Sequence, residues 1–205
     1  MTLRIYGVPK SRAFRALWVA EELGIPYENV PVDAAEGAKR PEYLAVNPVG
    51  KIPAIDDDGF RLSESLAITT YLVKRHGGPL LPASLQDEAS AMQWALWGAT
   101  EIERPAIDMV SNRYVLPPER RDAALARSAE EKLERPLAVL DAQLGKAPYL
   151  LGASFTVADL NVSSLLYTAW FNKVDFSRWP RIAGWLERCL TRPAALVARR
   201  MREQG

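Results

Sequence analysis

Two neighbouring segments of the sequence carry groups that could bind a short peptide. In the first, Pro53 opens an apolar strand, and a proline at an edge or after a cis bond leaves the backbone of Ile52 free for a guest. In the second, Glu64 and Ser65 begin a helix, where unpaired N–H groups and the helix dipole favour a carboxylate. Ser65 adds a hydroxyl, and Glu64 supplies the charge that would bind an amine. These groups suit a zwitterionic amino-acid head, although an ordinary hairpin followed by a capped helix is the alternative.

A third segment, residues 8–11, places Ser11 at or just before the start of the first predicted helix. Serine without an adjacent base is a poor nucleophile, and no histidine lies near Ser11 in the sequence. Its hydroxyl can instead donate a hydrogen bond to the sulfur of a bound thiol, which lowers the thiol pKa below about 8.5. One such charge-assisted bond contributes about 1.5–3 kcal/mol, enough to lower that pKa by about one or two. We therefore expect a bound thiol to be mostly thiolate at neutral pH.

The composition excludes several other classes of protein. The chain has 205 residues, of which 48% are hydrophobic and 25% charged, so it can bury one large core or two modest ones. Its net charge of +1, with both signs mixed along its length, predicts no nucleic-acid partner and no membrane binding. A single cysteine, Cys189, and a single histidine, His76, exclude a disulfide framework, a histidine-rich metal site and any Ser-His or Cys-His pair. The sequence has neither a signal peptide nor an apolar span, so we expect a cytoplasmic protein.

The first part of the chain has the element order of the thioredoxin fold. The predicted strands are residues 3–6, 27–32, 52–55 and 60–62, with a tight turn at 56–59. The predicted helices are one that ends at Gly24, a short turn at 41–46, and one that begins at Ser63 or Glu64 and ends near His76. The first strand, helix and second strand form a βαβ unit, whose strands should be parallel through a right-handed crossover.

The second part of the chain is predicted to be helical. Residues 77–86 are rich in glycine and proline and form the natural linker between two domains. The predicted helices are residues 85–114, 118–144, 157–171, 180–190 and 193–200. Pro105 and Pro136 fall inside the first two of these, where each should bend or interrupt its helix. Thr156 and Asp159 have the spacing of a capping box at the start of the third.

Four motifs occur in the order that is typical of one known family. They are residues 6–15, the segment NPVGKIP at 47–53, the Ser-Glu-Ser run at 63–65 and the helix start at 154–160. On these motifs the chain resembles, over essentially its whole length, the cytosolic glutathione S-transferases of the bacterial, serine-type, theta-like kind. The resemblance implies an α/β N-terminal thioredoxin-like domain, residues 1–78, that binds glutathione. It also implies an all-α C-terminal domain, residues 87–205, that contributes a pocket for the electrophile.

The same resemblance implies an activity and roles for individual residues. Such proteins are detoxification transferases that use glutathione as a co-substrate, need no metal, form homodimers and attack small hydrophobic electrophiles. In them the position of Ser11 steadies the glutathione thiolate, and Ile52 pairs with the cysteinyl backbone beside a cis Pro53. The positions of Glu64 and Ser65 hold the γ-glutamyl end.

The resemblance also implies that Lys51 binds glutathione, because the residue at this position commonly contacts it in the family. Lys39 or Arg40 could neutralise the glycyl carboxylate, but the alignment of these two residues is loose, so neither is assigned to the site. Trp97 or Met109 could line the apolar pocket for the second substrate, although we favour a place in the core for both.

Tyr6 is the rival of Ser11 for the catalytic hydroxyl. Several eukaryotic classes of the family use a tyrosine near the end of the first strand, where Tyr6 stands. We favour Ser11 because its spacing from Arg15 fits the serine-type classes, in which a tyrosine at the strand position packs instead. Arg15 itself is expected to bridge to the second domain or to the loop of Ser11.

Four other functions compete with transfer of glutathione to an electrophile. A glutathione-dependent isomerase, dehalogenase or disulfide reductase would use the same thiolate with a different outcome. The absence of a Ser-Ser-Cys run and of a cysteine at the Ser11 position disfavours the isomerase and the reductase. A non-enzymatic binding protein on this fold is the alternative from another class, and such proteins often lose the equivalents of Ser11, Ile52-Pro53 or Glu64-Ser65, which this chain keeps.

Overall fold

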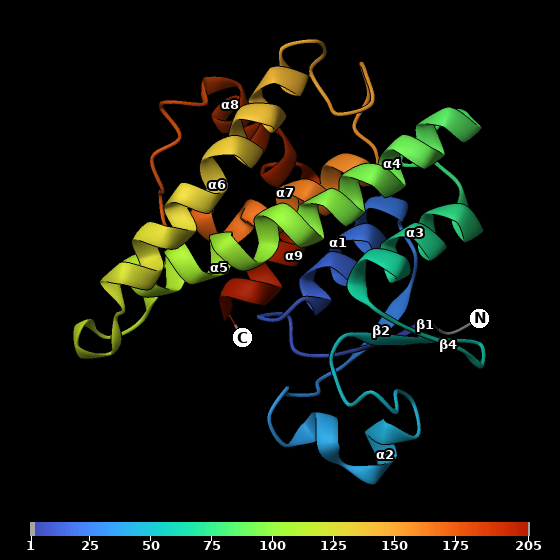
Figure 1. The fold of residues 1–205 in the computed structure, drawn as a ribbon. Helices are drawn as coiled ribbons and strands as arrows, with labels where there is room; N and C mark the ends of the chain where they lie inside the picture. The colour runs from blue at the N-terminus through green and yellow to red at the C-terminus, as the bar shows by residue number, and fades with distance from the viewer. Residues whose placement is uncertain (1–2, 205) are drawn as a thin grey trace. The chain divides into compact units, whose positions relative to one another are not determined.

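The computed structural model describes residues 3–204 and divides the chain into two compact units (Figure 1). One unit is formed by the chain up to Leu81 together with the segment from Thr191 onward, and the other is Pro82–Leu190. The first combines a small sheet with helices, and the second is helical, as predicted. Residues 1, 2 and 205, which the predicted domain ranges include, lie outside the described residues.

The sheet of the first unit has the order β2-β1-β3-β4. Its strands are β1 (Leu3–Tyr6), β2 (Tyr27–Val30), β3 (Ala54–Asp57) and β4 (Phe60–Ser63). Strand β1 is parallel to β2 and antiparallel to β3, which in turn is antiparallel to β4. The βαβ unit and the hairpin predicted from the sequence are therefore both present.

The hairpin differs from the prediction at both ends of β3. The strand begins at Ala54 and not at residue 52, because Pro53 has no N–H to give to the ladder. It then continues to Asp57, two residues into the predicted turn. The turn is reduced to Asp58 and Gly59, whose φ angles of 51° and 93° are those of a tight two-residue hairpin loop.

The described part of the first unit contains four α-helices. They are α1 (Ala13–Leu23), α2 (Pro41–Leu44), α3 (Ser65–His76) and α9 (Pro193–Gln204), with a 3-10 turn at Gly37–Lys39. Helix α1 ends as predicted at Gly24, which adopts the left-handed conformation (φ 63°) and donates its N–H to the carbonyls of the last turn. The inward side of β1, Leu3 and Ile5, is buried, as are the core positions of α1 and α3.

The last helix is a correction to the predicted domain boundary, which placed residues 191–205 in the helical domain. In the structure α9 packs along α1, with Ala195 and Ala198 fully buried. Two alanines on one face let a helix approach closely, but they do not reveal which surface it approaches. The helix was predicted at 193–200 and runs four residues further, to Gln204, whereas its packing partner depends on contacts far away in the sequence.

The second unit begins with one long helical run. It consists of α4 (Leu85–Trp97), a π-helical stretch (Gly98–Glu103), α5 (Arg104–Val110) and a second π-helical stretch (Ser111–Val115). Pro105 lies in the first turn of α5, directly after the first π-helical stretch, so the predicted interruption of the helix occurs here.

The predicted helix at 118–144 is divided into a 3-10 turn (Pro118–Arg120) and α6 (Ala123–Leu144). The side chain of Asp122 caps α6 by accepting the N–H groups of Ala124 and Leu125. Helix α6 continues through Pro136, where the sequence predicted a bend or an interruption.

Helices α7 (Val157–Phe171) and α8 (Pro180–Leu190) have the predicted bounds. The capping box is present, because Thr156 accepts from the backbone of Asp159 and the Asp159 carboxylate accepts from the backbone of Thr156. Asp159 also accepts from the Leu150 N–H and from Trp185 Nε1, both at 2.9 Å. Because α7 is buried on nearly every side, it forms the centre of this unit. Within residues 3–204, no helix has both the length and the apolar character needed to cross a membrane.

Candidate active site

The register of the sheet brings three of the predicted site segments to one edge. Tyr6 at the end of β1 faces Ala54 at the start of β3, and Ala54 faces Ser63 at the end of β4. Residues directly after β1, before β3 and after β4 must therefore lie next to one another. These are the loop that carries Ser11, the Lys51-Ile52-Pro53 segment and Glu64-Ser65.

The loop of Ser11 is held by the sheet at one end and by α1 at the other. Gly7 and Val8 donate their N–H groups to the carbonyls of Val30 and Val32, at 3.0 and 3.1 Å, which extends the pairing of β1 with β2. The Ser11 hydroxyl donates to the Val8 carbonyl at 2.7 Å and accepts from the Ala13 N–H at 3.1 Å. The hydroxyl thus lies at the start of α1, as predicted, and its proton can be redirected by rotation about Cβ–Oγ.

Gly7 joins this loop to the second segment. Its φ angle of 134° is rare for other residues, and an added Cβ would stand 3.0 Å from the Cβ of Ala13 and 3.3 Å from that of Ile52. Only glycine allows the backbone after β1 to pass this close to both.

The second segment offers its backbone as predicted. The Ile52-Pro53 peptide bond is cis, and Pro53 is buried. Ile52 precedes the ladder of β3, and within residues 3–204 its N–H and C=O have no hydrogen-bond partner. The neighbouring Lys51 has an exposed side chain, while its carbonyl accepts from Tyr43 Oη at 2.5 Å and Asn47 Nδ2 at 2.7 Å. These two donors fix the Lys51 carbonyl, so the segment is held without use of the Ile52 backbone groups.

The third segment provides an uncapped helix start. Helix α3 begins at Ser65, one or two residues later than predicted, because Glu64 has a positive φ of 68° and cannot be part of the helix. Glu64 does not cap the helix with its side chain, so the first-turn N–H groups remain available. A non-glycine residue with positive φ is strained, and such residues cluster at functional sites.

Arg15 is a site residue that the sequence reasoning assigned differently. Its Nη1 donates to Ser65 Oγ at 2.8 Å, whereas we expected it to bridge to the second domain or to the loop of Ser11. The Arg15 side chain is 5% exposed and Ser65 is 4% exposed, so this cation lies buried behind the start of α3. The charge adds to the helix dipole and favours an anion there. One feature of the sequence could have indicated that Arg15 is buried. It is a charged residue between the apolar residues Phe14 and Ala16 in a helix whose apolar side was predicted to be buried.

The ring of Tyr6 has a packing role in the sheet-bearing unit. The ring of Tyr6 packs against that of Tyr43, with centroids 6.1 Å apart, in a cluster with Ala38 and Ala54. Hydrogen bonds with Glu28 first and Tyr6 second raise the pKa of the exposed Arg4 guanidinium. A packing role for Tyr6 is what the sequence analysis expected if Ser11 carries the catalytic hydroxyl.

Lys39, one of the two open candidates for a carboxylate, donates from Nζ to the Gly50 carbonyl at 2.7 Å. It therefore supports the turn before Lys51. No group of three or more His, Cys, Asp or Glu side chains that could hold a metal ion occurs among residues 3–204.

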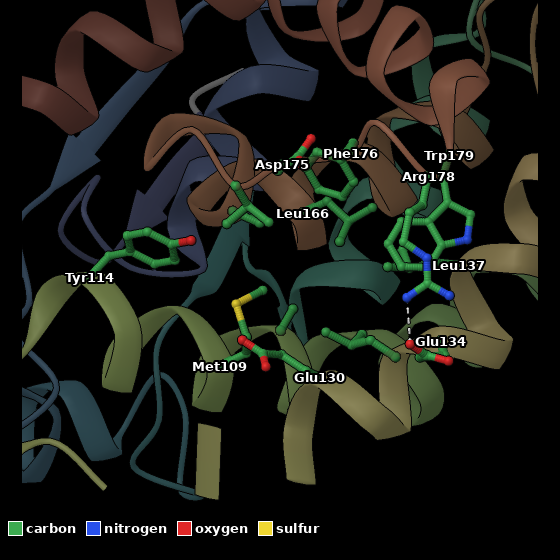
Figure 2. A pocket seen from close by; sticks show the side chains of 14 residues that line it. Met109, Tyr114, Glu130, Glu134, Leu137, Leu166, Asp175, Phe176, Arg178 and Trp179 are labelled. Carbon is green, nitrogen blue, oxygen red and sulfur yellow. Dashed lines mark hydrogen bonds and ion pairs between the residues drawn. The ribbon is translucent and has the colours of Figure 1, made fainter. Parts of the chain in front are cut away.

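The helical unit contains a cavity of about 320 Å³ between α5, α6, α7 and the segment before α8 (Figure 2). Met109 lines it, together with apolar side chains that include Leu133, Leu166 and Phe176. Trp97, the other predicted pocket residue, packs edge-to-face against Trp94 at 5.0 Å.

The rim of the cavity is charged. Arg178 and Glu134 form an ion pair at 2.6 Å, drawn as the dashed line in Figure 2. Glu130 is held by a bidentate pair with Arg113 at 2.8 and 2.9 Å. An apolar interior with a few polar groups at its rim is typical of a small-molecule site.

Comparisons with known proteins agree with this geometry. Residues 1–74 match the model of the glutathione S-transferase N-terminal domain, and residues 108–188 match that of the C-terminal domain. Glutathione S-transferase F13 of Arabidopsis thaliana is 34% identical over 210 residues, which cover 96% of this chain and 94% of that protein. Glutathione S-transferase 3 of Zea mays is 36% identical over 205 residues, 94% of this chain and 90% of that one. The chain belongs to the glutathione S-transferase family.

Solved structures of glutathione S-transferases have the same fold. The theta-class enzyme of Xanthomonas axonopodis pv. citri with glutathione bound superimposes with a TM-score of 0.87, 31% identity and 96% coverage of both chains. Glutathione transferase F7 of Populus trichocarpa gives the same TM-score with 28% identity, and covers 98% of this chain and 99% of that one. Since plant enzymes and a bacterial theta-class enzyme are both similar, the narrower bacterial, serine-type assignment stays a prediction.

Proposed function

We propose that this glutathione S-transferase is an active transferase, in which Ser11 stabilises the thiolate of glutathione for attack on an apolar electrophile. The observation that carries the proposal is the meeting of three features at one sheet edge. They are the serine hydroxyl at the start of α1, the unpaired backbone of Ile52 and the uncapped start of α3. Each suits a different part of one tripeptide.

Binding would begin with the γ-glutamyl end. Its carboxylate would accept hydrogen bonds from the first N–H groups of α3 and from the Ser65 hydroxyl, while Arg15 supplies a buried positive charge behind them. Its amine would pair with Glu64. The cysteinyl residue would then pair its backbone with Ile52, which directs its sulfur toward the neighbouring loop of Ser11. Lys51, with its exposed ammonium, would contact the remainder of the peptide.

The chemistry follows from ionisation of that sulfur. The thiol gives its proton to water, and the Ser11 hydroxyl turns from Val8 to donate to the thiolate. The thiolate uses an electron pair to form a carbon–sulfur bond with the electrophile. With an aryl or alkyl halide the carbon–halogen bond breaks and halide leaves with the bonding pair, whereas with an activated alkene the resulting carbanion takes a proton from water. Glutathione is consumed as a co-substrate, and no metal takes part.

The electrophile is proposed to bind in the helical unit, in the cavity that contains Met109. The apolar side chains of this cavity can bury a hydrophobic body, and its 320 Å³ are of the size of known ligand pockets. Thioether side chains adapt to irregular shapes, which suits a site for varied substrates.

A homodimer is also part of the proposal. Leu85, Met92 and Leu96 follow one face of α4 and are 77%, 50% and 60% exposed. Positions i, i+7 and i+11 on a helix form a stripe, and a second copy of the chain would remove this stripe from water. Light scattering should give twice the mass of the chain, and Met92→Glu should shift the protein toward the monomer.

A cytoplasmic location completes the proposal. The reaction needs glutathione in its thiol form, and the glutathione pool of the cytosol is kept reducing. The one cysteine, Cys189, is fully buried in α8, which argues against a reductase that uses a thiol of its own.

The proposal is tested by titrating glutathione into the protein in a calorimeter and measuring conjugation to an aryl chloride. Heat of binding together with halide release at a rate above that of free glutathione is the expected result. Binding without conjugation of any aryl halide, epoxide or activated alkene would favour a binding protein or one of the other glutathione-dependent reactions.

A further inference from the structure

The loop that carries Ser11 receives two hydrogen bonds from the far end of the chain. Arg202, near the end of α9, donates from Nη1 to the Ser11 carbonyl at 2.9 Å and to the Pro9 carbonyl at 3.2 Å. Its guanidinium carbon also lies 5.5 Å above the ring of Phe14 on α1. One cation therefore contacts the loop before Ser11, Ser11 itself and the first turn of α1.

Arg202 reaches this position because α9 is fixed along α1. At the start of α9, Arg192 forms a bidentate pair with Glu22, both N···O distances being 2.7 Å, and Trp18 Nε1 donates to the same carboxylate at 3.1 Å. Glu22 is near the end of α1 and Ser11 precedes its start, so the two helices are antiparallel. The pair with Glu22, whose side chain is 6% exposed, sets the position of α9 along α1.

Small side chains of α9 let the two helices pack closely along their length. Ala195 and Ala198 of α9 are fully buried, and Met201 Sδ lies 3.7 Å from Tyr27 Oη. Because α9 is fixed at one end by the ion pair and along its length by close packing, Arg202 is presented to the loop in a defined position.

The loop has few other hydrogen bonds among the described residues. Gly7 and Val8 are held by β2, the Ser11 N–H donates to the Val8 carbonyl at 3.0 Å, and the Ser11 carbonyl accepts the Phe14 N–H at 3.2 Å. Within this turn Pro9 has no N–H of its own, so its carbonyl is the backbone group through which Pro9 can be fixed. Arg202 donates to the Pro9 carbonyl and to the Ser11 carbonyl.

We propose that Arg202 is a positioning residue for the reaction, which holds the Ser11 loop so that the hydroxyl points at the glutathione sulfur. The inference rests on the proposed role of Ser11. It assigns a function in the chemical step to the C-terminal helix of the same unit. Its charge, close to the loop carbonyls, also favours the thiolate over the thiol.

The test replaces Arg202 by Met, which keeps an unbranched stem over Phe14 and removes the charge and both hydrogen bonds. Arg200→Met is the matched control, since it removes an exposed arginine from the same helix. For Arg202→Met we expect kcat to fall about 10-fold and the pKa of the bound thiol to rise by about one, with glutathione Kd within about 2-fold of the wild type. The thiol pKa is read from the ultraviolet absorbance of the thiolate across a pH series, and Arg200→Met should leave all three values unchanged.

Two further variants separate positioning from folding and from the role of Ser11. Arg202→Lys keeps the charge but not the planar fork, so a kcat about 3-fold below the wild type is expected, and it supplies the measurement if the Met variant does not fold. In a Ser11→Ala background, Arg202→Met should add less than about a 2-fold loss, because the group it positions is gone.

Wild-type kcat and thiol pKa in the folded Arg202 variants would overturn the inference, as would a full further 10-fold loss in the Ser11→Ala background. If Ser11→Ala itself retains wild-type activity, the proposed role of Ser11 fails instead, whatever the Arg202 variants show. The two failures are therefore distinguishable.

Discussion

The candidate glutathione site and the cavity of the helical unit are built in opposite ways. The first consists largely of backbone groups, placed by the ends of β1, β3 and β4 and the starts of α1 and α3. The second consists of side chains from several helices and one loop. Backbone groups are the same for every residue type, so a site of the first kind survives much sequence change, whereas a site of the second kind changes with each substitution. The backbone-built site should therefore keep the same co-substrate, glutathione, among related sequences. The side-chain-built cavity should accept different electrophiles.

The largest effect is expected on the stability of the helical unit, which contains a buried polar network around Asp159. Asp159→Ala removes an acceptor that binds the Leu150 and Thr156 N–H groups and the Trp185 indole in a fully buried place. We expect a loss of about 3–5 kcal/mol in the free energy of unfolding, measured by urea denaturation. Asp175→Ala, on an exposed loop carboxylate of the same unit, should cost less than about 1 kcal/mol. Equal losses in the free energy of unfolding for both variants would show that the buried Asp159 network contributes no more to stability than an exposed carboxylate does.

The second prediction concerns the single side chain on which the chemistry of the backbone-built site depends. Ser11→Ala should lower kcat for an aryl chloride by about 100-fold, with glutathione Kd changed less than about 3-fold, since only the thiolate contact is lost. Tyr6→Phe serves as the comparison and should change kcat by less than about 2-fold, because the ring of Tyr6 packs against that of Tyr43 and Phe keeps this packing. The reverse pattern in steady-state kinetics would transfer the catalytic role to Tyr6.

A third substitution separates binding from chemistry within the same site. Ser65→Ala removes a hydroxyl next to the proposed γ-glutamyl carboxylate, and a hydrogen bond to a charged group is worth about 1.5–3 kcal/mol. Calorimetry should therefore show glutathione Kd raised about 10-fold or more, while kcat at saturating glutathione stays within about 2-fold. Thr70→Ala removes a hydroxyl from the same helix, one that bonds only within α3, and should leave Kd unchanged. A fall in kcat as large as that of Ser11→Ala would contradict the division of roles.

The smallest effect is expected from a substitution in the side-chain-built cavity. It should change KM for the electrophile and leave glutathione binding unchanged. Ala169→Leu adds a branched side chain to the lining of the cavity and should raise KM for a bulky electrophile about 10-fold, with little change for a small one. Ala138→Leu, on the exposed side of α6, is the matched control. Should glutathione Kd rise along with KM, the independence of the two sites would be wrong.

Local signals in the sequence were sufficient for much of the fold and for the core of the candidate site. Helix α7 was predicted to the residue because a capping box marks its start, and Gly24 marked the end of α1. Ile52-Pro53 and Ser65 were identified because a strand proline and a helix start each imply specific free backbone groups. Ser11 followed from its place between a strand and a helix.

Contacts between distant parts of the chain were beyond local patterns. Arg15 bonds to a residue 50 positions away and Arg202 to one 191 positions away, and no local periodicity signals such a partner. The partner of α9 was missed for the same reason. The position of Glu64 outside the helix depends on a positive φ that residue type does not predict. Cavity residues such as Phe176 depend on how four elements pack, so Met109 and Trp97 could not be separated from sequence.

The return of α9 to α1 has a consequence for how the protein is made. Residues up to Leu81 leave the ribosome first, but the helix that covers them follows only after all of Pro82–Leu190 has been translated. At about 5–20 residues per second this leaves α1 partly uncovered for at least about 5 s in each newborn chain. The sheet-bearing unit is thus translated first but completed last. Until then α1 exposes the apolar surface that a nascent-chain chaperone would bind.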